Sequence, residues 1–344
     1  MHTERRIRVL VVDDSMLIRA LLVKGLSSDA GIEVVGTAHD PYEARDRIEQ
    51  LDPDVMTCDV EMPRMDGVTF IRKLLPQHPM PVIVVSTISE AIFDALAAGA
   101  VDFVTKPSMN AVDEVERFII ELIRKVKAAA KSNHRRSTEQ AALGIGAGLR
   151  DKEYGQQDDV VVIGASTGGT EAIHQLLSRL PARMPGIAIV QHIPPGFSRM
   201  FAERMNATTP FQVKEASSGD ILSRGTVCIA PGDKHMRLVK AGGQYIVKCE
   251  TGERVSGHLP SVDVLFESAA KLTGSRVIGV LLTGMGYDGA KGMLAIRRRG
   301  GRTIGQDAAS SVIYGMPRAA YELGAVEYQV PLHAMASRIC ALLG

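Results

Sequence analysis

The first third of the chain alternates short apolar runs with longer segments in which apolar residues recur at helical spacing. Short apolar runs bounded by turn residues are typical of buried strands, whereas the longer segments predict helices. Strands that alternate with helices predict a doubly wound parallel sheet. The expected strands span residues 7–12, 32–38, 54–58, 81–85 and 101–105, and the expected last helix spans residues 110–131.

The periodicity breaks down from about residue 128 to residue 158. A basic cluster at residues 131–138 and a glycine-rich segment at residues 144–148 give this stretch the composition of a flexible linker. The basic cluster could contact nucleic acid, but a solvated linker is the favoured interpretation. The glycines do not follow a strand, as a dinucleotide-binding loop requires. We therefore expect a first domain over residues 1–127, a linker over residues 128–158 and a second domain over residues 159–344.

The second domain repeats the alternation of strands and helices, with one interruption. Residues 211–250 contain short strand-like runs separated by Pro231-Gly232-Asp233 and by Gly242-Gly243, which predicts a β-hairpin insertion. The fold class expected for the whole chain is therefore α/β, with two doubly wound parallel-sheet domains. Outside the insertion, strands are expected at residues 160–163, 186–190, 277–282, 302–305 and 325–330, and helices at residues 196–205 and 261–272.

Composition narrows the classes of function. A chain of 344 residues with a net charge of +1 fits two globular domains and argues against a nucleic-acid or membrane surface as the main partner. No apolar stretch is long enough to cross a bilayer, and no signal peptide is evident. The four cysteines show no C-x-x-C spacing, so we expect reduced thiols in a cytoplasmic protein and no cysteine metal site.

A glycine-rich turn at the start of the second domain carries a candidate nucleophile. Ser166 lies between a predicted strand and a predicted helix, and Gly164 and Gly168 bracket it as G-x-S-x-G. Such a turn exposes the hydroxyl, and the N–H groups of the following helix can stabilise an oxyanion. The alternative is a turn that binds a phosphate, or no ligand at all.

Two further candidates follow predicted strands of the same domain. His192 comes after the strand at residues 186–190, and Asp288 lies in a glycine-rich turn after the strand at residues 277–282. A serine, a base that titrates near neutral pH and an acid that orients this base are the three types that a catalytic triad needs. Their order along the chain is Ser, His, Asp, which disfavours the α/β-hydrolase fold, in which the order is Ser, Asp, His.

Polar residues also follow the strands of the first domain. Carboxyl ends of parallel strands meet at one edge of a sheet, so these side chains are expected to lie together. Clustered carboxylates need a hard cation such as Mg²⁺, one carboxylate can accept a phosphoryl group, and a lysine and a hydroxyl can hold its oxygens. The alternative, that the acids only cap helices, fits Asp14 or Asp59 singly but not the set. The set comprises Asp13, Asp14, Asp59, Ser86 and Lys106.

Residues 7–128 resemble a response-regulator receiver domain with a flavodoxin-like sheet. The stretches VLVVDDS, DVEMPRMDG, VVSTIS and FVTKP carry this resemblance. It implies that Asp59 is the phosphoacceptor and that a chemotaxis histidine kinase is the phosphoryl donor. It also implies a cis peptide bond before Pro107. The other implied roles are Mg²⁺ ligation by Asp13, Asp14, Asp59 and the backbone carbonyl of Glu61, phosphoryl binding and switching by Ser86 and Lys106, and a switch aromatic at Phe103.

Residues 159–344 resemble the catalytic domain of the CheB family of protein-glutamate methylesterases, which is Rossmann-like. The resemblance rests on IGASTGGTEA, VQHIPPGFSRMFAERM, APGDKHM, PSVDVLFES, LLTGMGYDGAKG and GQDAASSVIYGMP. It implies Ser166 as nucleophile, His192 as base, Asp288 as the acid that orients the base, and the backbone N–H of Met285 in the oxyanion hole. One departure is Leu259, which stands where the pattern has a basic residue.

The resemblance implies an enzyme that hydrolyses glutamate methyl esters and deamidates glutamines on methyl-accepting chemoreceptors, without a cofactor for this reaction. We expect a shallow groove for a helical substrate, with the unphosphorylated receiver covering the groove and phosphorylation of Asp59 releasing it. An alternative is a phosphorylation-dependent receptor adaptor without catalysis, but the Ser/His/Asp set argues against it. A transcription factor is disfavoured because the second domain shows no basic recognition helix.

Overall fold

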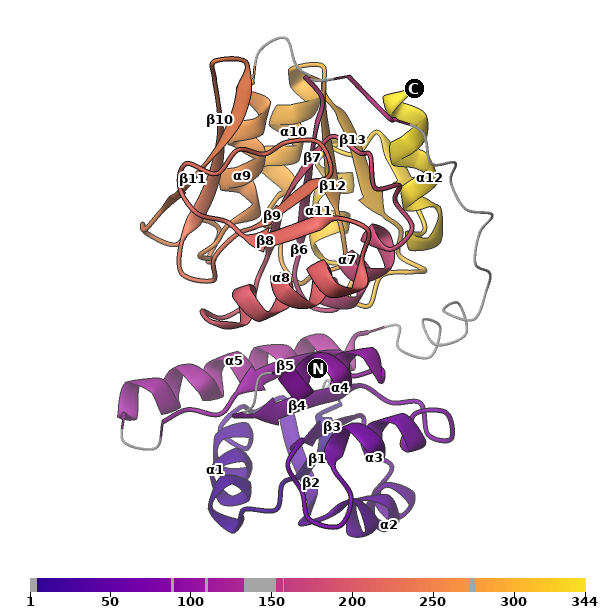
Figure 1. Ribbon diagram of the computed structural model, residues 1–344. Coiled ribbons are helices and arrows are strands. Elements are labelled where there is room, and N and C mark those ends of the chain that lie inside the picture. Colours follow the sequence, from indigo (N-terminus) through magenta and orange to yellow (C-terminus); the bar gives the residue numbers. More distant parts are fainter. Residues whose placement is uncertain (1–4, 88–89, 109–110, 133–152, 157, 273–275) are drawn as a thin grey trace. The chain divides into compact units, whose positions relative to one another are not determined.

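The computed structural model describes residues 5–87, 90–108, 111–132, 153–156, 158–272 and 276–344 (Figure 1). The chain forms two compact units that divide between Glu139 and Gln140. Most of the predicted linker lies outside the described residues. The boundaries at residues 127/128 and 158/159 therefore stay predictions.

The first unit is a five-stranded parallel sheet with the strand order β2-β1-β3-β4-β5, which confirms the doubly wound fold expected from the sequence. On the helical layers, α1 packs against α5, whereas α3 contacts both α2 and α4. The strands are β1 (Ile7–Val12), β2 (Ile32–Ala38), β3 (Val55–Cys58), β4 (Val82–Ser86) and β5 (Asp102–Thr105), and the helices are α1 (Met16–Leu26), α2 (Pro41–Leu51), α3 (Gly67–Leu74), α4 (Glu90–Ala97) and α5 (Val112–Ala130).

Local sequence explains where these helices begin. Asp40 caps α2, since its Oδ1 accepts hydrogen bonds from the N–H groups of Tyr42 and Glu43 at 2.8 Å each, and Pro41 occupies the first helical position. Ser15 is the N-cap of α1, so the helix starts directly after Asp13 and Asp14. The chain therefore turns sharply at the carboxyl end of β1 and leaves both acids at this edge of the sheet.

The second unit is a seven-stranded sheet with the order β14-β13-β12-β6-β7-β9-β8, in which all neighbouring strands are parallel. Helix α12 packs against α7, whereas α10 contacts both α9 and α11. The strands are β6 (Val160–Ala165), β7 (Gly186–Gln191), β8 (Gln212–Glu215), β9 (Thr226–Ile229), β12 (Val277–Leu281), β13 (Arg302–Gln306) and β14 (Tyr328–Val330), and the helices are α7 (Gly169–Leu177), α8 (Phe197–Thr208), α9 (Val262–Ala270), α10 (Ala290–Arg298), α11 (Met316–Glu322) and α12 (Leu332–Leu343).

The predicted insertion is partly different in the structure. Strands β10 (His235–Ala241) and β11 (Gln244–Glu250) form the expected antiparallel hairpin. Strand β9, however, pairs with β7 and with β8 in the main sheet, and the sequence analysis did not expect β8 at all. The reason is that β8 alternates exposed and buried residues at the sheet edge, so it lacks the continuous apolar run of a central strand.

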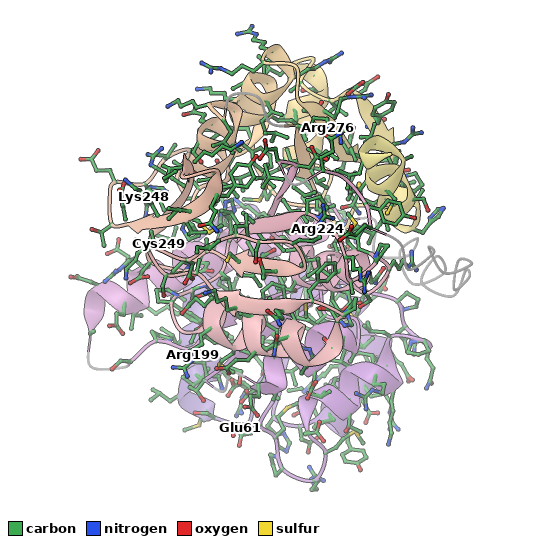
Figure 2. All side chains as sticks on the ribbon, turned by 45° about the horizontal axis from the view of Figure 1, so that its top comes forward. Glu61, Arg199, Arg224, Lys248, Cys249 and Arg276 are labelled. Atoms are coloured by element: carbon green, nitrogen blue, oxygen red, sulfur yellow. The ribbon has the colours of Figure 1, made fainter. Side chains whose placement is uncertain are left out.

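The start of the second unit is tied down by two arginines, both labelled in Figure 2. Arg224 donates hydrogen bonds to the backbone oxygens of Tyr154 (2.6 Å) and Gly155 (3.0 Å). Arg276 forms a two-pronged pair with Asp159, at 2.9 and 2.8 Å. The chain is therefore anchored to the second unit a few residues before β6 begins.

Apolar residues fill the space between the second sheet and its helices. Val162 of β6, Phe266 of α9 and Met293 of α10 are fully buried in one continuous cluster. Each side chain of this size stabilises the fold by about 1.5–3 kcal/mol through burial. Among the described helices, none combines the length and the apolar character needed to span a bilayer.

Candidate active site and phosphoacceptor site

The three predicted triad residues follow three adjacent strands of the second sheet. Ser166 comes directly after β6, His192 directly after β7, and Asp288 lies in the turn that follows β12. Strand β6 is central among the three, since it pairs with β7 on one side and with β12 on the other. Strand order reverses at β6, and such a point on a doubly wound sheet is where ligands bind.

The turn that carries Ser166 is closely packed. The N–H of Ser166 donates to the carbonyl of Thr283 at 3.0 Å, and its carbonyl accepts from the N–H of Gly169 at 2.7 Å and from Gln191 Nε2 at 2.9 Å. Gly168 has φ +74°, a left-handed conformation that glycine adopts at little cost. These contacts place the serine at the N-terminus of α7, as the G-x-S-x-G pattern predicted.

The glycine-rich turn after β12 lies directly against the serine. A Cβ added to Gly284 would lie 2.7 Å from Ser166 Cβ and 2.4 Å from Met316 Sδ, so only glycine fits there. The next residue is Met285, and its backbone N–H has no acceptor among the described residues. A free N–H beside the serine is the kind of donor that an oxyanion hole requires.

The base and the acid of the predicted triad are in contact. His192 Nε2 lies 2.8 Å from Asp288 Oδ2, and both side chains are almost fully buried. The other ring nitrogen, Nδ1, is buried without a hydrogen-bond partner among the described residues, and no hydrogen bond joins it to Ser166 in this arrangement. Catalytic hydrogen bonds are often long or poorly aligned without substrate. The imidazole therefore keeps one nitrogen available as a proton acceptor.

Asp288 sits at the N-terminus of α9, which the sequence analysis did not foresee. Its Oδ1 accepts from Ser261 Oγ at 2.8 Å and from the N–H of Asp263 at 3.0 Å, and its Oδ2 accepts from the N–H of Val262 at 2.8 Å. Burial opposes the charge of Asp288. The hydrogen bond and the positive charge from His192, with these helix N–H groups, nevertheless lower its pKa below the usual value.

The surroundings of Asp288 include two further residues that sequence reasoning missed. His258 stacks on His192 with a ring-centroid distance of 3.7 Å and an angle of 7° between the ring planes. Ser261 is the N-cap of α9 but gives its hydroxyl to Asp288 rather than to its own helix. The only sequence signal for both is their place just before the helix that begins at Val262.

In the first unit, three predicted residues converge at the carboxyl edge of the sheet. Lys106 Nζ lies 2.7 Å from Asp13 Oδ2 and 2.7 Å from Asp59 Oδ2. Burial works against the charge of Lys106, but its two carboxylate partners outweigh burial and raise its pKa. Burial also raises the pKa of Asp13, more than the neighbouring ammonium lowers it.

The acidic cluster fits the ligand preferences of a hard divalent cation. Carboxylate oxygens of Asp13, Asp14 and Asp59 all lie within 4.8 Å of one another. Asp13 Oδ2 faces the ammonium without an aligned hydrogen bond, so this buried oxygen can accept a further ligand. The cluster is typical of a magnesium site. Glu61 is exposed on the first unit, as Figure 2 shows, and its N–H donates to Asp59 Oδ1 at 3.3 Å.

The two predicted switch residues lie on the neighbouring strands. Ser86 ends β4 and is fully buried, and Phe103 lies on β5 with its ring buried. Lys125, which sequence reasoning did not single out, donates to the carbonyl of Phe103 at 2.5 Å and pairs with Asp102 at 3.1 Å. Helix α5 is thereby tied to the strand that carries Phe103.

The prediction of a cis bond before Pro107 is wrong. The cis peptide bond found among the described residues joins Leu259 and Pro260, so the bond between Lys106 and Pro107 is trans. The two isomers of an X-Pro bond differ by only about 0.5–1 kcal/mol, so local sequence does not decide between them. Lys106 reaches both carboxylates with the trans bond.

Comparisons with known proteins agree with this geometry. A family model described as CheB methylesterase matches residues 161–339, and a model described as response regulator receiver domain matches residues 9–115. The chain is 52% identical over 339 residues to a protein-glutamate methylesterase/protein-glutamine glutaminase 2 of Syntrophomonas wolfei, with 98% of each chain covered. A protein-glutamate methylesterase/protein-glutamine glutaminase of Syntrophotalea carbinolica is 51% identical over 346 residues, again with 98% of each chain covered.

A solved structure is similar to the second unit. The CheB methylesterase catalytic domain of Thermotoga maritima aligns with a TM-score of 0.52 and 35% sequence identity, covering 56% of this chain and 99% of that chain. The matched portion is thus a whole catalytic domain of that protein.

Proposed function

The chain belongs to the CheB methylesterase family and carries a response-regulator receiver domain, and we propose that Ser166, His192 and Asp288 are the catalytic residues of its second unit. It is a hydrolase of the protein-glutamate methylesterase and protein-glutamine glutaminase class. The observation that carries the triad proposal is the buried 2.8 Å contact between His192 and Asp288 on strands that flank the serine strand.

The proposed reaction begins at the Ser166 hydroxyl. His192 accepts the hydroxyl proton at Nδ1 while Ser166 Oγ attacks the ester carbonyl of a methylated glutamate side chain. The carbonyl oxygen becomes an oxyanion, which the free N–H of Met285 stabilises. The protonated His192 then gives its proton to the departing methoxide, so methanol leaves and a glutamyl ester of Ser166 remains.

Water completes the cycle by the reverse sequence of proton transfers. His192 takes a proton from water, the hydroxide attacks the glutamyl ester, and Ser166 recovers its proton as the glutamate is released. With a glutamine substrate the first leaving group is ammonia, and the later steps are the same. Asp288 keeps a proton on His192 Nε2, which leaves Nδ1 free to act as the base.

The proposed substrates are methyl-accepting chemoreceptors. Beside the triad, Met285 is half-buried and Tyr287 is 57% exposed, so the turn after β12 reaches the molecular surface. A surface site suits a glutamate carried on a protein helix better than it suits a free small molecule. A non-catalytic adaptor would need neither the buried acid–base pair nor the free N–H of Met285.

Phosphorylation of the receiver is the proposed control. A histidine kinase would transfer a phosphoryl group to Asp59, with Lys106 and Ser86 holding the phosphoryl oxygens. Asp13, Asp14, Asp59 and the backbone carbonyl of Glu61 would hold Mg²⁺, which neutralises charge on the phosphoryl donor when bound. A shift from a mostly inactive to a mostly active enzyme needs about 5.5 kcal/mol of differential stabilisation.

The test compares four variants of the full chain on methylated receptor membranes. We expect Ser166→Ala to abolish methanol release and Ser178→Ala, an exposed serine on α7's C-terminal side, to leave it unchanged. Asp59→Asn should keep basal turnover but lose stimulation by a small-molecule phosphoryl donor, whereas the exposed Asp46→Asn should keep both. Undiminished methanol release by Ser166→Ala would refute the catalytic assignment. Labelling of Ser166 by a serine-directed fluorophosphonate separates an enzyme from an adaptor.

A further inference from the structure

His258 lies face to face with the proposed base and has no part in the triad. Its ring is parallel to that of His192 within 7°, at a centroid distance of 3.7 Å. A catalytic imidazole must hold one orientation, because a ring turned by a few tens of degrees directs its free nitrogen away from the nucleophile. Asp288 fixes only one edge of the His192 ring. The stacked ring restrains the plane.

The turn that carries His258 is rigid. Val255 and His258 exchange two backbone hydrogen bonds, at 3.0 Å each, around Ser256 and Gly257. Both central residues have positive φ, +54° for Ser256 and +83° for Gly257, as in a two-residue hairpin turn. A serine in this region is unfavourable unless its surroundings hold it there.

The serine of this turn is held by the same helix that binds Asp288. Ser256 Oγ donates to Asp263 Oδ2 at 3.0 Å, and Asp263 Oδ1 accepts from the N–H of Gly292 at 2.8 Å. The N–H of Asp263 in turn donates to Asp288 Oδ1 at 3.0 Å. Residues 255–263 therefore support the base through its ring face and the acid through its carboxylate.

We propose that His258 is a positioning residue for the hydrolase: its stacked ring holds the plane of His192 so that Nδ1 faces the Ser166 hydroxyl. The proposal rests on the function proposed above for Ser166, His192 and Asp288. Positioning requires a flat ring at this place but no proton on it. A phenyl ring can therefore replace the imidazole, and a methyl group cannot.

Two substitutions separate positioning from proton transfer. In the full chain, His258→Ala should lower kcat for methanol release about 10- to 100-fold, the range expected from misplacing a catalytic group. KM should change less than about threefold, because the ring is assigned to the base and not to the substrate. His258→Phe should recover most of kcat. The exposed His333→Ala is the matched control and should behave as wild type.

A second measurement removes the receptor from the experiment. The rate at which a fluorophosphonate labels Ser166 reports how well His192 activates the hydroxyl, and it should fall in parallel with kcat in His258→Ala. Phosphorylation of Asp59 and the melting temperature show whether this variant is folded.

The outcomes distinguish the two proposals. An inactive Ser166→Ala with a His258→Ala variant of wild-type kcat would overturn the positioning role alone. A His258→Phe variant as slow as His258→Ala would overturn it in favour of proton transfer, and an effect on KM alone would assign His258 to substrate binding. An active Ser166→Ala would overturn the triad on which the inference rests.

Discussion

Replacing Asp288 by asparagine tests the proposed active site, because the amide cannot satisfy the donors around it. Oδ1 receives Ser261 Oγ and the N–H of Asp263, and Oδ2 receives His192 Nε2 and the N–H of Val262. The Ser261 hydroxyl and the imidazole can each reverse roles and accept from an amide NH₂. A backbone N–H cannot, so in either orientation of asparagine one buried N–H loses its acceptor.

The loss of that acceptor sets the expected magnitude. An unsatisfied buried donor costs about 1–3 kcal/mol in the free energy of unfolding. For a unit of this size, each kcal/mol lowers the melting temperature by about 2–4 °C. If the NH₂ group faces His192, the imidazole must carry its proton on Nδ1 and can no longer deprotonate Ser166. We therefore expect kcat to fall about 10³- to 10⁴-fold.

The neighbouring carboxylate offers a matched control. Asp263 is equally buried, but its partners are the N–H of Gly292 at Oδ1 and the hydroxyl of Ser256 at Oδ2. An asparagine there can accept from the N–H and donate to the hydroxyl, so all groups stay paired. Burial and the charge of Asp288 raise the pKa of Asp263, so losing this charge is not costly. We expect Asp263→Asn to melt within a few degrees of wild type.

The assays are methanol release from methylated receptor membranes and thermal unfolding monitored by calorimetry. A melting temperature and a kcat of Asp288→Asn within experimental error of wild type would refute the assignment of Asp288. An equal loss of stability in Asp263→Asn would refute the hydrogen-bond reasoning, since the amide should fit at that site.

The remaining predictions concern pH, packing and metal. Because the folded-state pKa of Asp288 is lowered, its contribution to stability is present above the unfolded value near 3.9 and is lost as pH falls through the folded value. The difference in melting temperature between wild type and Asp288→Asn should therefore shrink below about pH 4. Gly284→Ala should lower kcat more than about 100-fold without affecting Asp59 phosphorylation, because its Cβ would displace Ser166, whereas Gly252→Ala, with its nearest listed neighbour at 3.5 Å, should retain activity. Removing Mg²⁺ with EDTA should abolish phosphorylation of Asp59 and leave basal methanol release unchanged. Because the pKa of Asp13 is raised, Mg²⁺ affinity measured by titration should begin to fall at a pH above the usual carboxylate range.

Local sequence patterns were sufficient to predict the two parallel sheets and the chemical types at their edges. A strand buried on both faces is a continuous apolar run, so β1 and β6 are visible without any knowledge of their neighbours. The first polar residue after such a run lies at the carboxyl edge of the sheet, which is why Asp13, Ser166 and His192 were recognised as candidates. The edge strand β8 was missed because it lacks such a run.

The tertiary structure decided which candidates meet and what holds them. His192 and Asp288 are 96 residues apart along the chain and come into contact because β12 and β7 flank β6 in the sheet. Strand order of this kind depends on the packing of the whole domain, and no local pattern specifies it. The same holds for the α9 N-terminus beneath Asp288 and for the ring of His258 against His192. The chemical types of the proposed site are thus local properties of the chain, whereas their orientation arises from contacts between distant segments.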